Sequence, residues 1–270
     1  MNFFTLDRER EMGKQLSRAA ETTMKLFNDS EVYEYVNRIT QNIALNSDLK
    51  VPLVLKIVND DQVNAFSLPG GYVYVTTGLL NEADNEAQIA GVIGHEVAHI
   101  AARHGTRTVS KATFWASILR TAAVMSPGGA VAEFPKIVGA DFSANLLFAR
   151  MQRGAEDEAD LLAVEYAYAA GYDPAEYVVL FEKVKALQKS KPSVVTKMFE
   201  SHPATESRIR KVQRVIEDYL PARDQYLVTS SSFEEMQARM RAILDGRILA
   251  AEQPQKRPVL KKRSKWDPPE

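Results

Sequence analysis

The sequence contains no cysteine, so disulfide bonds, thiolate metal ligands and cysteine nucleophiles are all excluded. It also lacks a surplus of charge. Its 34 basic residues nearly balance 35 acidic ones, and a formal net charge of −1 argues against nucleic acid as a partner. Neither absence decides the compartment, because many periplasmic proteins also lack cysteine. The search for a functional site therefore turns to the four histidines and the carboxylates.

Long apolar runs are missing as well. The most apolar region, residues 112–147, is interrupted by charges, prolines and glycines, and no stretch of about 18 apolar residues remains to span a membrane. This region could cover a cleft or touch lipid, and the sequence does not decide between the two. The first 16 residues alternate acids and bases, unlike a signal peptide. That pattern predicts either a cytosolic protein or one whose export signal has been removed.

The length and composition are those of an ordinary globular protein. With 270 residues, 45% apolar and 26% charged, the chain can bury a core without disulfide or metal support. We expect one folded domain over residues 1–250. Residues 251–270 are basic, rich in proline and almost free of apolar side chains, which predicts a disordered tail. A solvated tail is favoured over one that binds acidic lipid or a partner.

Hydrophobic periodicity predicts an α+β fold that is mainly α, with a small β-sheet. Ser30 and Asn85 are suited to cap helices, and Gly105 and Gly171 are suited to end them. A Pro-Gly-Gly turn joins two of the short strands. Helices are expected over residues 6–27, 30–45, 85–105, 108–125, 143–170, 174–189, 203–219 and 232–244, and strands over 51–58, 63–66, 72–76 and 225–228.

The helix predicted from residue 85 carries a His-Glu-x-x-His motif made of His95, Glu96 and His99. Histidines four residues apart share one helix face, so both imidazoles can bind one zinc ion at about 2.0–2.1 Å. Glu96 lies about 100° round the helix, near the metal without ligating it. There it can hold and deprotonate a water molecule. The alternative is that the two histidines have this spacing by chance, and such chance matches are rare in a chain of this length.

A third metal ligand must come from elsewhere in the chain. The metzincin continuation of the motif would need glycine at 102 and histidine at 105, but the sequence has Ala102 and Gly105. His104 lies five residues after His99, about 140° round the helix, and is predicted to face away from the metal. We therefore expect His104 to be a polar residue near the helix C-terminus, favoured there by the helix dipole.

The acidic run that begins at Glu156 offers the best third ligand. Glu156 and Asp160 are four apart on a predicted helix and share a face, from which Asp157 and Glu158 turn away. Glu156 could bind the metal while Asp160 accepts a hydrogen bond from the free ring N–H of a liganding histidine. An acidic run on its own is usually a solvated helix face. Its combination with the two histidines favours the metal site.

These residues make the chain resemble the gluzincin family that includes the HtpX heat-shock protease, the CAAX prenyl proteases and the soluble BepA-like peptidases. The resemblance implies a zincin-like fold with the small sheet beside the active-site helix, and one zinc ion per chain. It also favours a periplasmic or membrane-associated location. Two features of family members are missing: the transmembrane helices of HtpX and CAAX proteins, and the tetratricopeptide-like repeats of BepA-like proteins. The matching segments are residues 64–80, 94–105, 153–160 and 201–209.

The same resemblance suggests roles for three further features. His202 is the only histidine outside the zinc helix, and it could approach the zinc, approach a substrate oxyanion, or fill the fourth coordination position and close the site. Arg208 could pair with Glu156 or Asp160, or stabilise an oxyanion. Bland alternatives are a turn residue for His202 and a surface ion pair for Arg208. A substrate-binding edge strand is predicted from alternating residues, namely Tyr72, Val73, Tyr74 and Val75.

The sequence therefore predicts a zinc endopeptidase that acts on unfolded or extended polypeptides in protein quality control, with catalytic residues Glu96, His202 and Arg208. One alternative is a zinc-containing, chaperone-like factor that binds polypeptides with little turnover. A third interpretation makes the zinc purely structural, which needs a closed site with four ligands. Peripheral contact with a membrane stays possible. The substrate and the oligomeric state cannot be read from the sequence.

Overall fold

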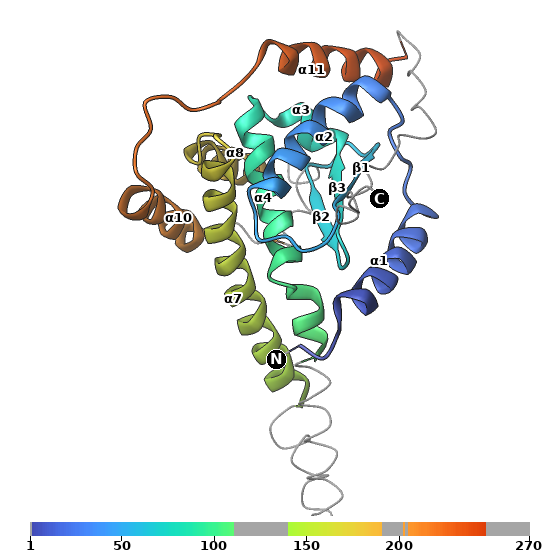
Figure 1. Ribbon diagram of the computed structural model, residues 1–270, viewed down its shortest axis with the longest axis vertical. Coiled ribbons are helices and arrows are strands. Elements are labelled where there is room, and N and C mark those ends of the chain that lie inside the picture. The colour runs from blue at the N-terminus through green and yellow to red at the C-terminus, as the bar shows by residue number, and fades with distance from the viewer. Residues whose placement is uncertain (1, 111–139, 191–201, 203–204, 247–270) are drawn as a thin grey trace, which may run out of the picture.

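A computed structural model of the chain describes residues 2–110, 140–190, 202 and 205–246. Within these residues the chain is mainly helical with one three-stranded sheet, as the sequence predicted (Figure 1). The helices are α1 (Leu6–Glu21), α2 (Ser30–Leu45), α3 (Thr77–Glu82), α4 (Glu86–Ala101), α7 (Ala140–Ala169), α8 (Ala175–Ser190), α10 (Glu206–Tyr219) and α11 (Ser231–Leu244), and the strands are β1 (Val54–Val58), β2 (Ala65–Leu68) and β3 (Tyr72–Thr76).

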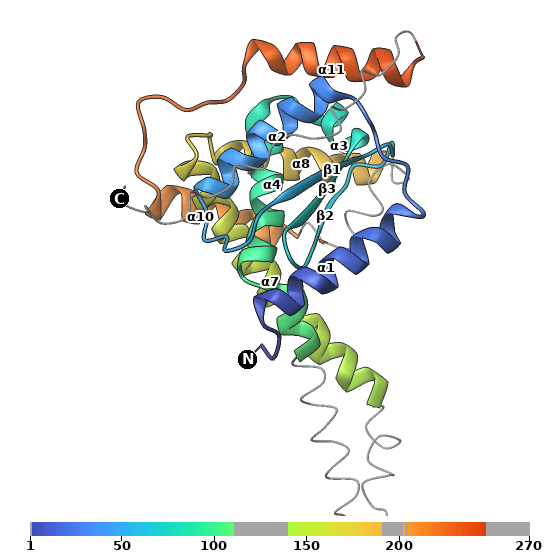
Figure 2. The same ribbon diagram turned by 45° about the vertical axis from the view of Figure 1, so that its right-hand side comes forward.

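Helix α4 lies at the centre of the fold (Figures 1 and 2). The sheet packs on one side of it and α7 on the other, with α2 and α8 completing its surroundings. Helix α10 lies against α7 and α8, whereas α11 crosses α2 and α3 at the opposite end of the molecule. Helix α1 lies beside the sheet near β2. This arrangement places the predicted zinc helix in the core, between the sheet and the helix that carries the acidic run.

The strand order of the sheet is β1-β3-β2. Strand β3 pairs with β1 in parallel and with β2 in antiparallel fashion, so β3 is the central strand. Gly70 and Gly71, in the predicted turn between β2 and β3, have φ angles of 82° and 105°. Such positive values are easily adopted only by residues without a Cβ atom. The turn chemistry read from the sequence is therefore confirmed.

Helix α4 is buried on almost all sides. Its N-cap is Asn85, whose side chain accepts a hydrogen bond from the backbone N–H of Gln88, as the sequence predicted. Every residue of α4 is buried except His99 and Ala101. Burial therefore extends round nearly the whole helix, because neighbouring helices and the sheet enclose it.

Two glycines let neighbouring helices approach α4 closely. A Cβ atom at Gly91 would lie 2.7 Å from the Cβ of Tyr177 on α8. At Gly94 it would lie 3.1 Å from the backbone carbonyl oxygen of Ala163 on α7. Both distances are shorter than an ordinary carbon contact. Larger residues at these positions would push α7 and α8 away from the zinc helix.

Several predicted boundaries are wrong in detail. The N-cap of α2 is Asp29 rather than Ser30, and the Asp29 carboxylate is fully buried in a two-bond ion pair with Arg239 on α11. The first helix ends at Glu21 instead of residue 27, since the chain then turns to reach the sheet. Residues 225–228 contribute one isolated bridge and no strand. Helix α3 was not predicted at all.

Some predictions concern residues outside the described part of the chain. These are most of the apolar region 112–147, residues 111–125 of the helix expected over 108–125, and the tail 251–270. Residues 108–110 of that expected helix are described and helical, in a helical segment that begins earlier, at residue 104. Among the helices that are described, none combines the length and the apolar character needed to cross a membrane.

The close packing around Gly91 gives a stability test. Alanine in a helix interior is about 0.5–1 kcal/mol better than glycine, but overpacking against Tyr177 should cost about 1–3 kcal/mol. We therefore expect Gly91→Ala to lower the free energy of unfolding in chemical denaturation. Gly154→Ala on α7 is the matched control, because a Cβ atom there has no neighbour within 4 Å. Equal stability of the two variants would contradict this view of the packing.

Candidate metal centre

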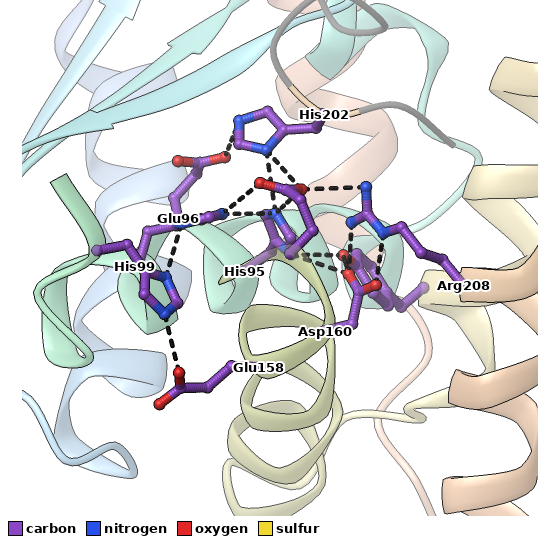
Figure 3. Close-up of polar contacts among 10 residues, drawn as sticks. His95, Glu96, His99, Glu158, Asp160, His202 and Arg208 are labelled. Atoms are coloured by element: carbon purple, nitrogen blue, oxygen red, sulfur yellow. Dashed lines mark hydrogen bonds and ion pairs between the residues drawn. The ribbon is translucent and has the colours of Figure 1, made fainter. Parts of the chain in front are cut away.

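Helix α4 presents His95 and Glu96 to one buried site, with His99 one turn further on (Figure 3). The Nε2 atoms of His95 and His99 lie 3.0 Å apart. Glu96 is almost fully buried, and its Oε2 atom has no hydrogen-bond partner among the described residues. A buried carboxylate oxygen without a partner is costly unless something else occupies the site. The predicted spacing has thus brought these three side chains together.

Helix α7 brings Glu156 to the two histidines. Its Oε2 atom lies 3.4 Å from His95 Nε2, and its Oε1 atom lies 3.4 Å from His99 Nε2. Glu156 is buried, so this carboxylate does not belong to a solvated helix face. The close approach of α7 to Gly94 makes the contact possible.

His202 completes a group of four donors. Its Nδ1 atom lies 2.9 Å from Glu156 Oε2 and 3.3 Å from His95 Nε2. One donor atom from each of His95, His99, Glu156 and His202 falls within 4.8 Å of the others. Ligands at about 2.0–2.1 Å from a tetrahedral zinc ion are separated by roughly 3.3 Å. Five of the separations, from 2.9 to 3.4 Å, lie near that value, so the donor set can hold a zinc ion with His202 in the fourth position.

Asp160 and Tyr177 hold the other side of His95. Asp160 Oδ1 lies 3.1 Å from His95 Nδ1, and the Tyr177 hydroxyl lies 2.9 Å from the same nitrogen. The hydroxyl also donates to Asp160 at 2.8 Å. These contacts keep the His95 proton on Nδ1 and leave Nε2 for the metal. The role expected for Asp160 agrees with this geometry. Tyr177 had no sequence signal, because it lies on a different helix with no motif around it.

The Arg208 guanidinium forms ion pairs with two carboxylates. It is buried at the start of α10, where Thr205 caps the helix. Its guanidinium donates two hydrogen bonds of 2.7 Å to Asp160 and lies 3.0 Å from Glu156. Figure 3 shows it on the far side of Asp160 from the histidines. Of the two predicted roles, this geometry favours ion pairing and gives no support to oxyanion binding.

His104 does not face away from the site, and that prediction was wrong. Its Nδ1 atom lies 2.9 Å from His99 Nδ1, and its Nε2 atom lies 3.2 Å from Glu158. Helix α4 ends at Ala101 rather than Gly105, and Arg103 adopts a left-handed φ of 58°. The count of about 100° per residue fails beyond that break. Glu158 turns away from the face of Glu156 and Asp160, as expected, and its exposed carboxylate contacts His104.

The strand assigned to substrate binding is also corrected. Residues Tyr72, Val73, Tyr74 and Val75 belong to β3, which has a hydrogen-bonded strand on each side. A central strand has no free backbone edge for a peptide. Strands β1 and β2 are the two edges of the sheet, and β2 is the edge strand that packs against α4. A pocket of about 270 Å³ opens between β2 and the site, lined by Phe66, Leu68, Glu96 and His202 among others.

The surroundings of the site shift the pKa values of His95 and His99 in opposite directions. Burial lowers the pKa of His95, but hydrogen bonds to Asp160 and Glu156 outweigh it and raise this pKa to about 9. Burial and the charge of His95 lower the pKa of His99 to about 2. Burial raises the pKa of Glu156, yet hydrogen bonds from His202 and His95 bring it well below its usual range. The site holds its carboxylate charged, and a metal would replace the His95 proton.

Comparison with known proteins agrees with this geometry. The model of Peptidase family M48 matches residues 30–216. The beta-barrel assembly-enhancing protease of Escherichia coli K12 is 26% identical over 215 residues, which are 76% of this chain and 43% of that protein. The mitochondrial metalloendopeptidase OMA1 of Schizosaccharomyces pombe is 32% identical over 210 residues, 74% of this chain and 57% of that one.

A third relative is closer to this chain in length. The metalloprotease LoiP of Escherichia coli is 30% identical over 183 residues, 67% of this chain and 70% of that protein. By contrast, the chain spans less than half of the beta-barrel assembly-enhancing protease. These matches confirm the family resemblance drawn from the motifs.

The protonated His95 predicts a pH dependence for zinc uptake. Its pKa of about 9 means that zinc must displace one proton at neutral pH. Apparent zinc affinity should therefore fall about tenfold for each pH unit between about pH 8 and pH 6. Competition with a chromophoric chelator would measure the affinity, and calorimetry in buffers of different ionisation enthalpy would count the proton. An affinity that stays constant over this range would contradict the assignment.

The third ligand can be tested with two glutamates of one helix. Glu156→Gln removes a candidate ligand. We expect zinc affinity to fall by more than the roughly 10–100-fold lost when a residue that only hydrogen-bonds to a ligand is replaced. Glu165→Gln is the control, because Glu165 is exposed on the same helix. Metal content after dialysis would be read by atomic absorption. Equal zinc retention by both variants would remove Glu156 from the ligand set.

Proposed function

The chain belongs to peptidase family M48, and on that basis we propose that it is a zinc endopeptidase that hydrolyses extended or unfolded polypeptides. The observation that carries this proposal is the pairing of a zinc-compatible donor group with Glu96, a buried acid with one oxygen that has no hydrogen-bond partner in the described part of the chain. The relatives named above as proteases and metalloendopeptidases support the same reaction class. One of them is named for enhancing β-barrel assembly, which supports a role in protein quality control.

His95, His99 and Glu156 would hold the ion. A bound zinc ion supplies a Lewis acid that polarises the peptide carbonyl and lowers the pKa of a nearby water. Glu96 orients that water and accepts one of its protons while the oxygen attacks the carbonyl carbon. As the C–N bond breaks, Glu96 returns the proton to the leaving amine. Asp160 and Arg208 keep the donors in place and do not touch the reacting atoms.

We propose that His202 closes the resting site. Its Nδ1 atom occupies the fourth donor position, where a catalytic site leaves room for water or substrate. Its Nε2 atom lies 3.5 Å from Glu96 Oε1, so one ring engages both the donors and the general base. Substrate would have to displace His202 before hydrolysis.

Substrate would bind along β2. An extended peptide added to this edge forms main-chain hydrogen bonds and reads little sequence, which suits unfolded polypeptides. The pocket between β2 and Glu96 supports this placement. Family membership favours action in the periplasm or at a membrane surface.

The four members of the donor group also favour a second candidate function, in which the zinc site is closed and does not catalyse hydrolysis. Structural zinc sites use four protein ligands, whereas catalytic sites use three. A closed site would fit a chaperone-like factor that binds polypeptides with little turnover. Turnover separates the two functions, since binding alone yields no products.

Removing the general base should abolish turnover. We expect Glu96→Gln to keep the fold and its zinc but to cleave unfolded casein at least about 100-fold more slowly, the usual scale for a lost general base. Glu165→Gln again serves as the control on an exposed glutamate. Full casein cleavage by Glu96→Gln would refute the assigned mechanism. Casein binding without cleavage by the wild-type protein would support the chaperone-like factor.

Removing His202 should open the site. We expect His202→Ala to retain zinc through the other three donors and to cleave casein several-fold faster, because a larger fraction of molecules is competent. Initial rates at equal zinc occupancy would measure the effect. A slower rate at full zinc occupancy would instead assign His202 to the catalytic step.

A further inference from the structure

Helix α1 lies before the residues matched by the family model, yet it is anchored to the sheet beside the site (Figure 2). A Cβ atom at Gly13 would fall 1.8 Å from the backbone oxygen of Pro69 in the β2–β3 turn, so the backbones of the helix and the turn pack directly against each other. At the far end of α1, the Tyr74 hydroxyl of β3 lies 2.8 Å from Ser17 Oγ. The position of α1 is therefore fixed relative to β2.

The N-terminal end of α1 is anchored by Glu9. Its side chain is almost fully buried and accepts hydrogen bonds from Arg103 Nε at 2.8 Å, from Asn2 at 3.3 Å and from the Thr106 hydroxyl. A buried carboxylate persists only with partners of this kind. Arg103 holds a left-handed φ of 58°, which is unfavourable for a non-glycine residue. The hydrogen bonds of Glu9 join α1 to the residues that follow the zinc helix.

These anchors form one wall of the pocket of about 270 Å³. Glu9, Arg103 and Thr106 line it on one side, and β2 lines the other. Glu96, His99 and His202 also line the pocket, so it is continuous with the proposed catalytic site. Its volume is just below the roughly 300 Å³ at which pockets for whole small molecules begin. The pocket is suited to a single side chain.

The pocket on the other side of His202 is much smaller. It has about 10 Å³, is lined by Tyr177 and Phe181 among others, and has room for one water at most. His202 lines both pockets. A peptide lying along β2 would therefore meet a pocket of about 270 Å³ on one side of the site and almost no free volume on the other.

We propose that the larger pocket receives one apolar side chain of the substrate and that α1, through Glu9, sets the size of the residue accepted. Phe66, Leu68 and Ile100 give it apolar walls. The charge of Glu9 is already paired with Arg103, so among the described residues this wall offers no free partner to an entering charged side chain, which would pay for desolvation. This inference rests on the proposed peptidase function and adds the residue class that is selected.

One variant should fill the pocket without disturbing α1. Gly105 lines the pocket, and a Cβ atom there would meet only Pro69 Cγ, at the ordinary contact distance of 3.6 Å. Gly105→Leu therefore takes up part of the cavity volume. The reverse change is Glu9→Ala, which removes the end wall. Gly154→Leu is the matched control, since it adds the same side chain at an open position on α7.

The experiment begins by mapping casein cleavage sites by mass spectrometry. The map should show an apolar preference at one position next to the cleaved bond. Quenched peptides with Ala, Leu or Trp at that position then give kcat/KM for each variant. We expect Gly105→Leu to lower the Leu-to-Ala ratio about tenfold, the scale of a few methylenes in a pocket. Glu9→Ala should raise the Trp-to-Leu ratio, and Gly154→Leu should change neither.

Binding separates this inference from the peptidase function itself. Fluorescence anisotropy in the Glu96→Gln background measures affinity for the same Leu and Ala peptides without turnover. A Leu preference that Gly105→Leu removes supports the pocket even if the wild-type protein cleaves nothing. Equal affinity for both peptides, or ratios unchanged by Gly105→Leu, overturns it. The Gly105→Leu result holds even if Glu9→Ala unfolds.

Discussion

The close contact between α4 and α7 is the constraint on which the candidate metal centre depends. Gly94 lets the two helices approach until Glu156 lies 3.4 Å from both His95 and His99. Helices α8 and α10 then supply Tyr177 and Arg208 behind these donors. Side chains held on packed helices keep a site's geometry better than side chains on loops. His202 lies outside any described helix, which agrees with its proposed role as the movable member.

The metal site and the proposed pocket share their walls. Glu96 and His202 line both the metal site and the 270 Å³ pocket, and Arg103 follows directly after the end of the zinc helix. The left-handed turn at Arg103 therefore does two things. It directs His104 back toward His99, and it lets the guanidinium reach Glu9 on α1. One local departure from helical geometry thus connects the metal donors to the pocket wall.

The sequence predicted what depends on local periodicity. His95 with His99, and Glu156 with Asp160, are pairs four residues apart, and regular helices brought each pair to one face. Features set by long-range packing or by a single unusual dihedral angle were missed. His104 was misplaced because Arg103 breaks the helix. Strand β3 was taken for an edge strand because an alternating pattern of residues does not reveal the order of strands in a sheet. Tyr177 carries no local pattern.

The central claim is that three histidines and one glutamate converge on a single zinc ion. Zinc K-edge X-ray absorption on the purified protein tests it most directly, because the spectrum counts imidazole and oxygen neighbours. The account predicts four light-atom neighbours at about 2.0–2.2 Å with the scattering pattern of three imidazoles. A spectrum with fewer than three imidazoles, or a protein that takes up no zinc, would contradict it.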